Sequence, residues 1–140
     1  NNEHPDFARL PHSFHSAYTR AFAAIHPHGK IIQIHGFNSK KRQSLIAQQA
    51  HIILSIGSKG HSKYLLKLQS CQKNHHWKSV RYPQQVSELG ATKNSVGILM
   101  RHLAHAGFIH IELNLPSRKA LIKQKDKLAK FGNCLVEALL

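Results

Sequence analysis

The sequence predicts an α/β fold in three layers, with a mostly parallel central sheet of about four strands flanked by helices. Short runs of β-branched residues alternate along the chain with longer stretches whose apolar residues recur every three or four positions. The chain has 140 residues, which suits one compact domain, so we expect a single α/β domain over residues 1–140. A hydrophobic content of 41% is ordinary for a globular domain and excludes a wholly disordered basic chain.

Hydrophobic periodicity locates the elements of the first half. Between Phe14 and Ile25 the apolar residues recur at helical spacing, and Ser13 can cap the helix that they define. The β-branched residues of 30–35 predict a short strand that closes at Gly36. The elements expected next are a basic loop over 39–42, a strand over 51–56 and a helix over 64–71.

The second half repeats the alternation of strand and helix. The strand expected over 80–82 is short and ends before a proline, and the apolar spacing of 96–103 predicts a helix. The apolar residues of 108–113 predict a fourth strand. A Pro-Ser pair opens the last helix, over 116–135, in which Gly132 is the weak point because glycine disfavours helix.

Two classes of protein are not expected from this sequence. Its apolar stretches fall short of the ~20 residues that a membrane-spanning helix needs, so no membrane span is predicted. Its two cysteines, Cys71 and Cys134, lack Cys-x-x-Cys spacing. We therefore interpret them as small buried hydrophobic residues and expect neither a disulfide nor a thiolate zinc site.

A strong positive charge points to an acidic partner. The chain has 20 Lys and Arg against 6 Asp and Glu, and 13 His, for a formal net charge of +14. No helix-turn-helix, RNP or zinc-finger pattern accompanies these charges, so binding to nucleic acid would be nonspecific and salt-sensitive. The turn at 57–60 could cradle an anion but lacks phosphate-loop spacing. A noncatalytic basic module that binds nucleic acid or another polyanion is therefore one of two functional hypotheses.

His35 and Glu112 are the candidate site residues because each lies where a predicted strand ends. Ligands of open α/β sheets bind beyond the carboxyl ends of the strands. Glu112 stands among apolar residues, and a buried carboxylate must be paired, bound to a metal or shifted in pKa. A glutamate on the solvent face, or one paired with a Lys or Arg, is the alternative interpretation.

Two segments resemble strands of the zinc carboxypeptidase superfamily. Residues 31–38 (IIQIHGFN) resemble the strand that ends in the third zinc ligand, and residues 108–114 (FIHIELN) resemble the strand that carries the catalytic glutamate. Between them, Tyr82 followed by LGATKN at 89–94 is similar to the family's loop of a tyrosine and a Gly-rich turn. The resemblance covers about residues 30–118, and relatives include N-formylglutamate and poly-γ-glutamate amidohydrolases and the succinylglutamate desuccinylase group.

The resemblance implies a zinc-dependent hydrolase that cleaves an amide bond near a carboxylate, with a small acidic or peptide-like substrate. His35 would bind zinc, and Glu112 would activate the metal-bound water and pass its proton to the leaving amine. Tyr82 and Arg118 would contact the substrate. Zinc would lower the pKa of its water toward ~7 and polarise the scissile carbonyl.

The family's first two zinc ligands come from a His-x-x-Glu motif that this sequence lacks. Three explanations stay open: the domain is partial and the motif lies outside the chain, the chain is a degenerate relative without metal, or other histidines replace the motif. His12 and His15, spaced His-x-x-His, are the replacement ligands that we assign beside His35. His26 and His28, just before the first strand, are a second pair to consider.

Overall fold

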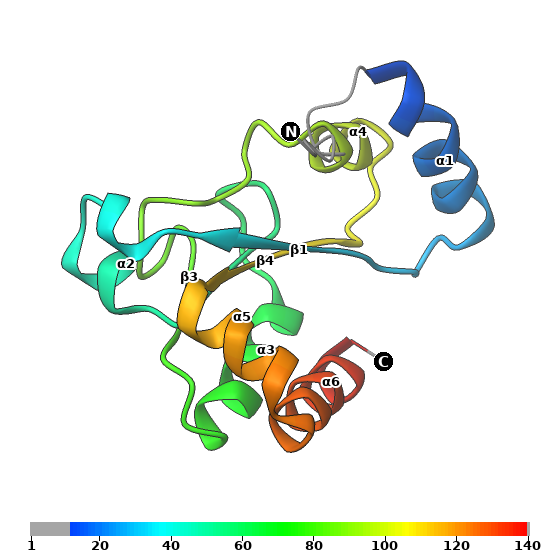
Figure 1. Cartoon of the computed structure of the whole chain (residues 1–140). Helices are drawn as coiled ribbons and strands as arrows, with labels where there is room; N and C mark the ends of the chain where they lie inside the picture. Colours follow the sequence, from blue (N-terminus) through cyan, green and yellow to red (C-terminus); the bar gives the residue numbers. More distant parts are fainter. Residues whose placement is uncertain (1–11, 140) are drawn as a thin grey trace, which may run out of the picture.

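The computed structural model describes residues 12–139, with side chains from residue 16 onward, and contains a four-stranded sheet between two layers of helices (Figure 1). The strand order is β1-β4-β2-β3. β1 pairs with β4 and β2 with β3 in parallel, whereas β2 pairs with β4 antiparallel, so the sheet is mixed and mostly parallel. The predicted α/β architecture is confirmed. The strands are β1 (Ile31–Phe37), β2 (Ile52–Ser55), β3 (Ser79–Arg81) and β4 (Phe108–Asn114).

Six helices of residues 12–139 surround the sheet. In Figure 1, α1 and α4 lie above the sheet, α2 lies at its left end, and α3, α5 and α6 lie below. Within the described residues, no helix is both long and apolar enough to cross a membrane, in agreement with the sequence. The helices are α1 (His12–Ile25), α2 (Leu45–Gln49), α3 (Lys63–Asn74), α4 (Ser95–His102), α5 (Leu115–Lys123) and α6 (Lys125–Leu139), with a 3-10 turn at Ser39–Lys41.

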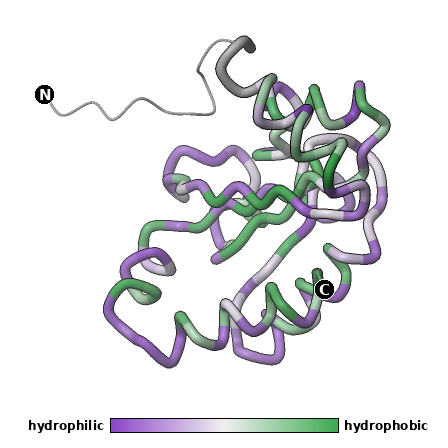
Figure 2. Tube along the Cα trace, turned by 90° about the vertical axis from the view of Figure 1, so that its right-hand side faces the viewer, coloured by the Kyte–Doolittle hydropathy of each residue, from purple (hydrophilic) through white to green (hydrophobic). Residues whose placement is uncertain are grey.

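The larger core lies between the sheet and α3, α5 and α6. Alternate residues of a strand point to the same face, so β2 and β4 direct five apolar side chains into this layer. Burying each such Ile or Leu contributes about 1.5–3 kcal/mol to stability. Hydrophobic segments accordingly follow the central strands, and the outer loops are mostly hydrophilic (Figure 2). The five residues are Ile52, Leu54, Ile109, Ile111 and Leu113.

The opposite face of the sheet has two smaller apolar clusters instead of one core. Phe37, Ile53 and Tyr82 pack with residues of α2 in the first cluster. Phe108 packs with Met100 of α4 and with residues of α1 in the second cluster. The strand residues between the clusters are polar, and they form the candidate site.

The C-terminal segment folds as two helices, so the prediction of one helix over 116–135 is wrong. α5 ends at Lys123, Gln124 is extended, and α6 begins at Lys125. The break lets Leu121 of α5 and Phe131 of α6 enter the same core from two helix directions. Apolar residues at helical spacing on both sides of the break gave no sign of it.

Cys71 of α3 and Cys134 of α6 form a disulfide, so the prediction of two unpaired buried cysteines is wrong. Their Cα atoms lie 5.5 Å apart although the residues are 63 positions apart in the sequence. The packing of α3 against α6 creates this proximity, and local spacing carries no signal for it. Only Cys134 is fully buried, whereas Cys71 is partly exposed.

Replacing Gly132 by alanine should stabilise the protein. Gly132 lies inside α6, and a Cβ added there would have no atom within 4 Å. Because alanine has the higher helix propensity, Gly132→Ala should raise the free energy of unfolding by about 0.8–1 kcal/mol, measured by urea denaturation. Gly107→Ala is the contrasting variant, since its Cβ would overlap the backbone carbonyl oxygen of Gly29 and should destabilise. A destabilised Gly132→Ala would contradict this account of α6.

Candidate functional site

The structure brings His35 and Glu112 together from positions 77 residues apart. β1 and β4 are parallel neighbours, and in their register the Cα of His35 pairs with that of Glu112. Paired residues of adjacent strands point to the same face, which here is the face with the two small apolar clusters. Both lie near the carboxyl ends of their strands, where α/β proteins place functional groups.

His110 is a third member of this group, and the sequence analysis missed it. It lies two residues before Glu112 on β4 and therefore on the same face. Its ring centroid is 4.9 Å from that of His35, and its Nε2 is 3.7 Å from Oε1 of Glu112. The signal was available, because residues i and i+2 of a predicted strand share a face.

Burial keeps the His110 imidazole uncharged at neutral pH. His110 is 4% exposed, and its pKa is lowered to about 4, first by loss of hydration and then by the adjacent His35. Its Nδ1 has no hydrogen-bond partner among the described residues. The carboxylate of Glu112 therefore lies in a largely buried setting beside a neutral ring.

The segment between β3 and α4 is tied to the sheet on both sides of this group. Ser55, whose Cα pairs with that of His110 from the β2 side, donates a hydrogen bond from Oγ to the carbonyl of Gly90 at 2.9 Å. Asn94 donates from Nδ2 to Oε1 of Gln33, the β1 residue paired with His110, at 2.7 Å. The Gly-rich turn is thus fixed at both ends, and the half-buried His35 on edge strand β1 is the more exposed end of the group.

Tyr82 and Arg118 have different positions relative to the group. Tyr82 is buried in the cluster with Ile53, whose Cα pairs with that of Glu112, and its ring fills the space that a Cβ on Gly90 would need. The guanidinium of Arg118 lies against Gly36, whose missing side chain would point away from the face of His35. Tyr82 therefore shares the face of the group, whereas Arg118 lies across the sheet. Substrate contact by either residue stays a prediction.

The predicted replacement ligands are not seen beside His35. His12 begins α1, but the side chains of His12 and His15 lie outside the described part of the chain. His26 and His28 precede β1, so about 13 Å of extended strand separates them from His35. Among the described side chains, a group of three potential metal ligands within 4.8 Å of one another is found at Cys71, His75 and Cys134, and none is found at His35.

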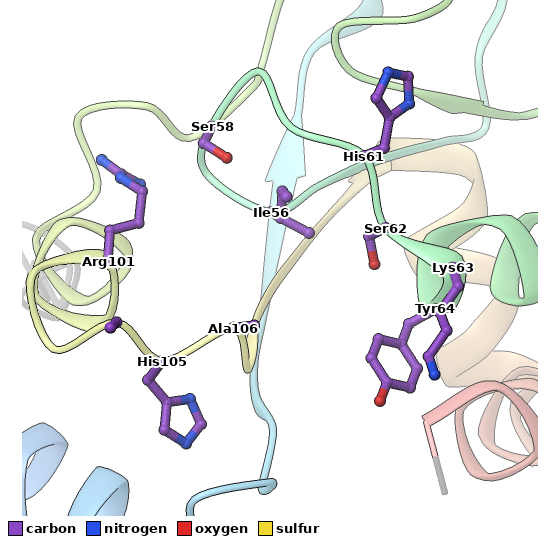
Figure 3. Close-up of a pocket in the computed structure, with 10 residues that line it drawn as sticks. Ile56, Ser58, His61, Ser62, Lys63, Tyr64, Arg101, His105 and Ala106 are labelled. Atoms are coloured by element: carbon purple, nitrogen blue, oxygen red, sulfur yellow. The ribbon is translucent and has the colours of Figure 1, made fainter.

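A pocket lies at the other end of the sheet, beyond the last residue of β2. It has a volume of about 430 Å³ and lies between residues 56–64 and 101–106 (Figure 3). Arg101 and His105 lie on one side and His61 and Lys63 on the other, and none of the described carboxylates lines it. Arg101 is held there because its Nη1 donates to the carbonyl of Gly57 at 2.6 Å. This basic pocket is formed by one of the turns that the sequence singled out.

His110 should make stability fall in acid. Its pKa is about 4 in the folded protein and 6.5 without burial, so below about pH 6.5 the unfolded chain binds a proton that the folded one does not. The free energy of unfolding of metal-free protein should fall by up to about 3 kcal/mol between pH 6.5 and 4 because of this residue, and be unaffected by it above pH 6.5.

Urea denaturation across this pH range would measure the effect. His110→Gln should flatten the decline, and His61→Gln, which removes an exposed imidazole, should keep the wild-type slope. An unchanged slope in His110→Gln would show that His110 titrates normally.

Comparisons with known proteins do not place the chain in a family. No family model matches it, and no curated protein or solved structure is significantly similar to it. The resemblance to zinc carboxypeptidases therefore stays a prediction drawn from short strand segments.

Proposed function

We propose that the chain is a metal-dependent hydrolase domain that acts on an amide bond near a carboxylate. The observation that carries this proposal is the pairing of His35 with Glu112 on adjacent parallel strands. An imidazole and a carboxylate on one face, near the carboxyl ends of strands, are the donor and the base that such a reaction needs. The resemblance to the amidohydrolases agrees with this pairing in the order and type of the residues.

In this proposal Glu112 is the general base and acid. Its carboxylate takes a proton from the attacking water and delivers it to the leaving nitrogen, which requires no other titrating group. The neutral His110 ring lies beside this carboxylate, and the Gly-rich turn is held over the same face by the Ser55 hydrogen bond. His35 would hold a zinc ion, which when bound would supply Lewis-acid activation.

The donor set fits zinc in kind and is incomplete in number. A catalytic zinc takes three protein ligands, and of the described residues on this face the proposal assigns one, His35, because Glu112 is the base. In this proposal the remaining ligands come from side chains outside the described part, among them His12 and His15, or from another chain. The high positive charge suits a substrate with a carboxylate, because it attracts acidic molecules.

Metal content and hydrolysis of N-acyl glutamates and γ-glutamyl amides would test the proposal, using oxidised protein with the disulfide intact. Wild type should hold about one zinc per chain, and His35→Ala should lose it. Glu112→Gln should keep the metal and lose activity by about 10²–10⁴-fold, because a positioned base contributes that much. His102→Ala, which removes an exposed imidazole of α4, should change neither result.

Two outcomes would contradict the proposal. One is wild-type hydrolysis in both His35→Ala and Glu112→Gln. The other is oxidised wild-type protein that takes up no zinc and cleaves none of these amides. The second result would leave polyanion binding as the better-supported function.

Polyanion binding is the second candidate, and the basic pocket favours it. Four basic or imidazole side chains line that pocket, and among residues 16–139 no acidic side chain lines it. Phosphate contacts by Lys and Arg give binding that weakens steeply with salt and ignores sequence. This candidate needs neither a metal nor Glu112, so the two hypotheses can be separated experimentally.

Binding of a single-stranded oligonucleotide, followed by fluorescence anisotropy at several salt concentrations, would test this candidate. Lys63→Gln should weaken binding and reduce the slope of log affinity against log salt by about 1, because one phosphate contact is lost. Lys123→Gln, which removes an exposed lysine of α5 away from the pocket, is the matched control. Equal losses in the two variants would indicate diffuse attraction with no role for the pocket.

A further inference from the structure

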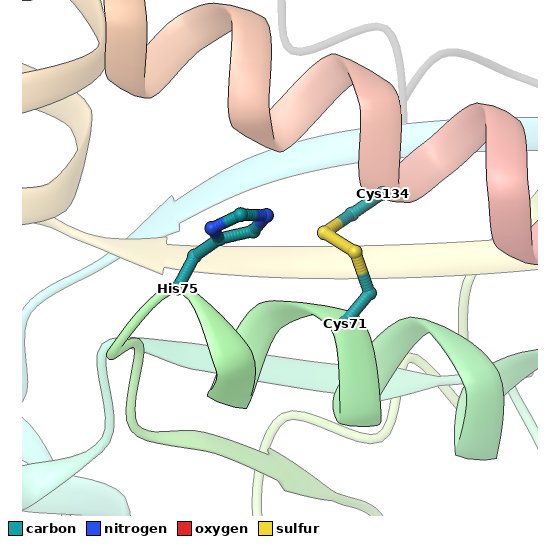
Figure 4. A group of neighbouring side chains, drawn as sticks. All are labelled: Cys71, His75 and Cys134. Atoms are coloured by element: carbon teal, nitrogen blue, oxygen red, sulfur yellow. A yellow bond between two sulfur atoms is a disulfide. The ribbon is translucent and has the colours of Figure 1, made fainter.

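The disulfide between α3 and α6 has two additional metal-binding side chains beside it. His75 follows Cys71 by four residues, at the end of α3, and Glu137 follows Cys134 by three residues on α6. Residues at these spacings lie on the same face of a helix. Each of the two packed helices therefore contributes one sulfur and one further donor, and Figure 4 shows the His75 ring beside the disulfide, between the two helices.

The distances among His75 and the two cysteines suit a single ion, and Glu137 lies beside one of the cysteines. One ring nitrogen of His75 and the two sulfurs all lie within 4.8 Å of one another. Oε2 of Glu137 lies 3.7 Å from Sγ of Cys71. A disulfide sulfur has no proton to donate, so this last contact is not a hydrogen bond in the oxidised protein.

The surroundings would favour thiolates and allow an ion to enter. A cavity of about 460 Å³ opens beside Cys71, His75 and Glu137, and Lys67 lines it. A nearby ammonium and the overall charge of +14 favour deprotonated sulfur, which is the form that binds metal. Cys134 is fully buried at the inner end, whereas His75 and Glu137 are exposed at the outer end.

We propose that the Cys71–Cys134 disulfide is the oxidised form of a zinc site completed by His75 and Glu137. A dithiol reductant supplies two electrons and two protons, becomes a disulfide itself and leaves two thiols on the protein. Zn²⁺ then displaces the two thiol protons and binds both thiolates, the His75 imidazole and the Glu137 carboxylate, the tetrahedral set of N, S and O donors that zinc prefers. The site is independent of His35 and Glu112, which lie across the sheet.

Cobalt binding to the full chain would test this proposal. The protein is reduced with dithiothreitol, and the reductant is then removed under anaerobic conditions. The reduced protein should bind one Co²⁺ and show a thiolate-to-cobalt charge-transfer band. Added Zn²⁺ should displace the cobalt and abolish the band. Oxidised protein should lack the band. His75→Ala should weaken the thiolate-bound cobalt by about 10-fold or more, because it removes a ligand. Asn74→Ala, which alters the same cavity without removing a donor, should bind as wild type does.

The same experiment separates this site from the proposed catalytic one. His35→Ala should keep the charge-transfer band, because His35 lies beside Glu112 and the cysteines lie on the other side of the sheet. Cys71→Ser/Cys134→Ser should lose the band while keeping any metal held by His35. The proposal is overturned if reduced wild-type protein, shown to be folded by circular dichroism, gives no thiolate band. Wild-type affinity in His75→Ala would overturn it equally.

Discussion

The parallel pairing of β1 with β4 is the contact on which both the fold and the candidate site depend. Its register places His35 opposite Glu112 and Gln33 opposite His110. A shift of one residue would turn every β1 side chain to the other face, sending His35 away from Glu112 and exposing different isoleucines. The alternate apolar residues of β4 that pack toward α3, α5 and α6 fix which side of that strand faces the larger core, and so hold His110 and Glu112 on the opposite face.

That opposite face has polar side chains in its middle, at a cost to stability that the two flanking apolar clusters must offset. Buried polar groups stabilise a fold only when they have partners, and Ser55 and Gln33 gain theirs through hydrogen bonds to the segment that passes over the face. A neutral His110 adds no desolvated charge of its own. An arrangement that costs stability and adds little to packing is what a functional site requires, which favours the interpretation of this face as a site.

Local patterns were enough to predict the strands and most of the helices, since alternation and helical spacing are properties of neighbouring residues. They also indicated His35 and Glu112 as candidate residues through their positions at strand ends, and the same alternation could have revealed His110. The break between α5 and α6 at Gln124 and the Cys71–Cys134 disulfide depend on how α6 packs against α3, which is a contact between distant parts of the chain. The antiparallel pairing of β2 with β4 within a mostly parallel sheet likewise depends on contacts between distant parts of the chain.

The two proposed metal sites use opposite faces of one strand. Alternation along β4 sends His110 and Glu112 toward the Gly-rich turn, and Ile109, Ile111 and Leu113 into the core that contains Cys134. Replacing the disulfide by a bound ion would therefore first change the packing of apolar side chains, which can adjust. The polar face is held separately by the hydrogen bonds of Ser55 and Asn94, which involve neither α3 nor α6. The sheet thus isolates the chemistry of His35 and Glu112 from the redox state of the cysteines.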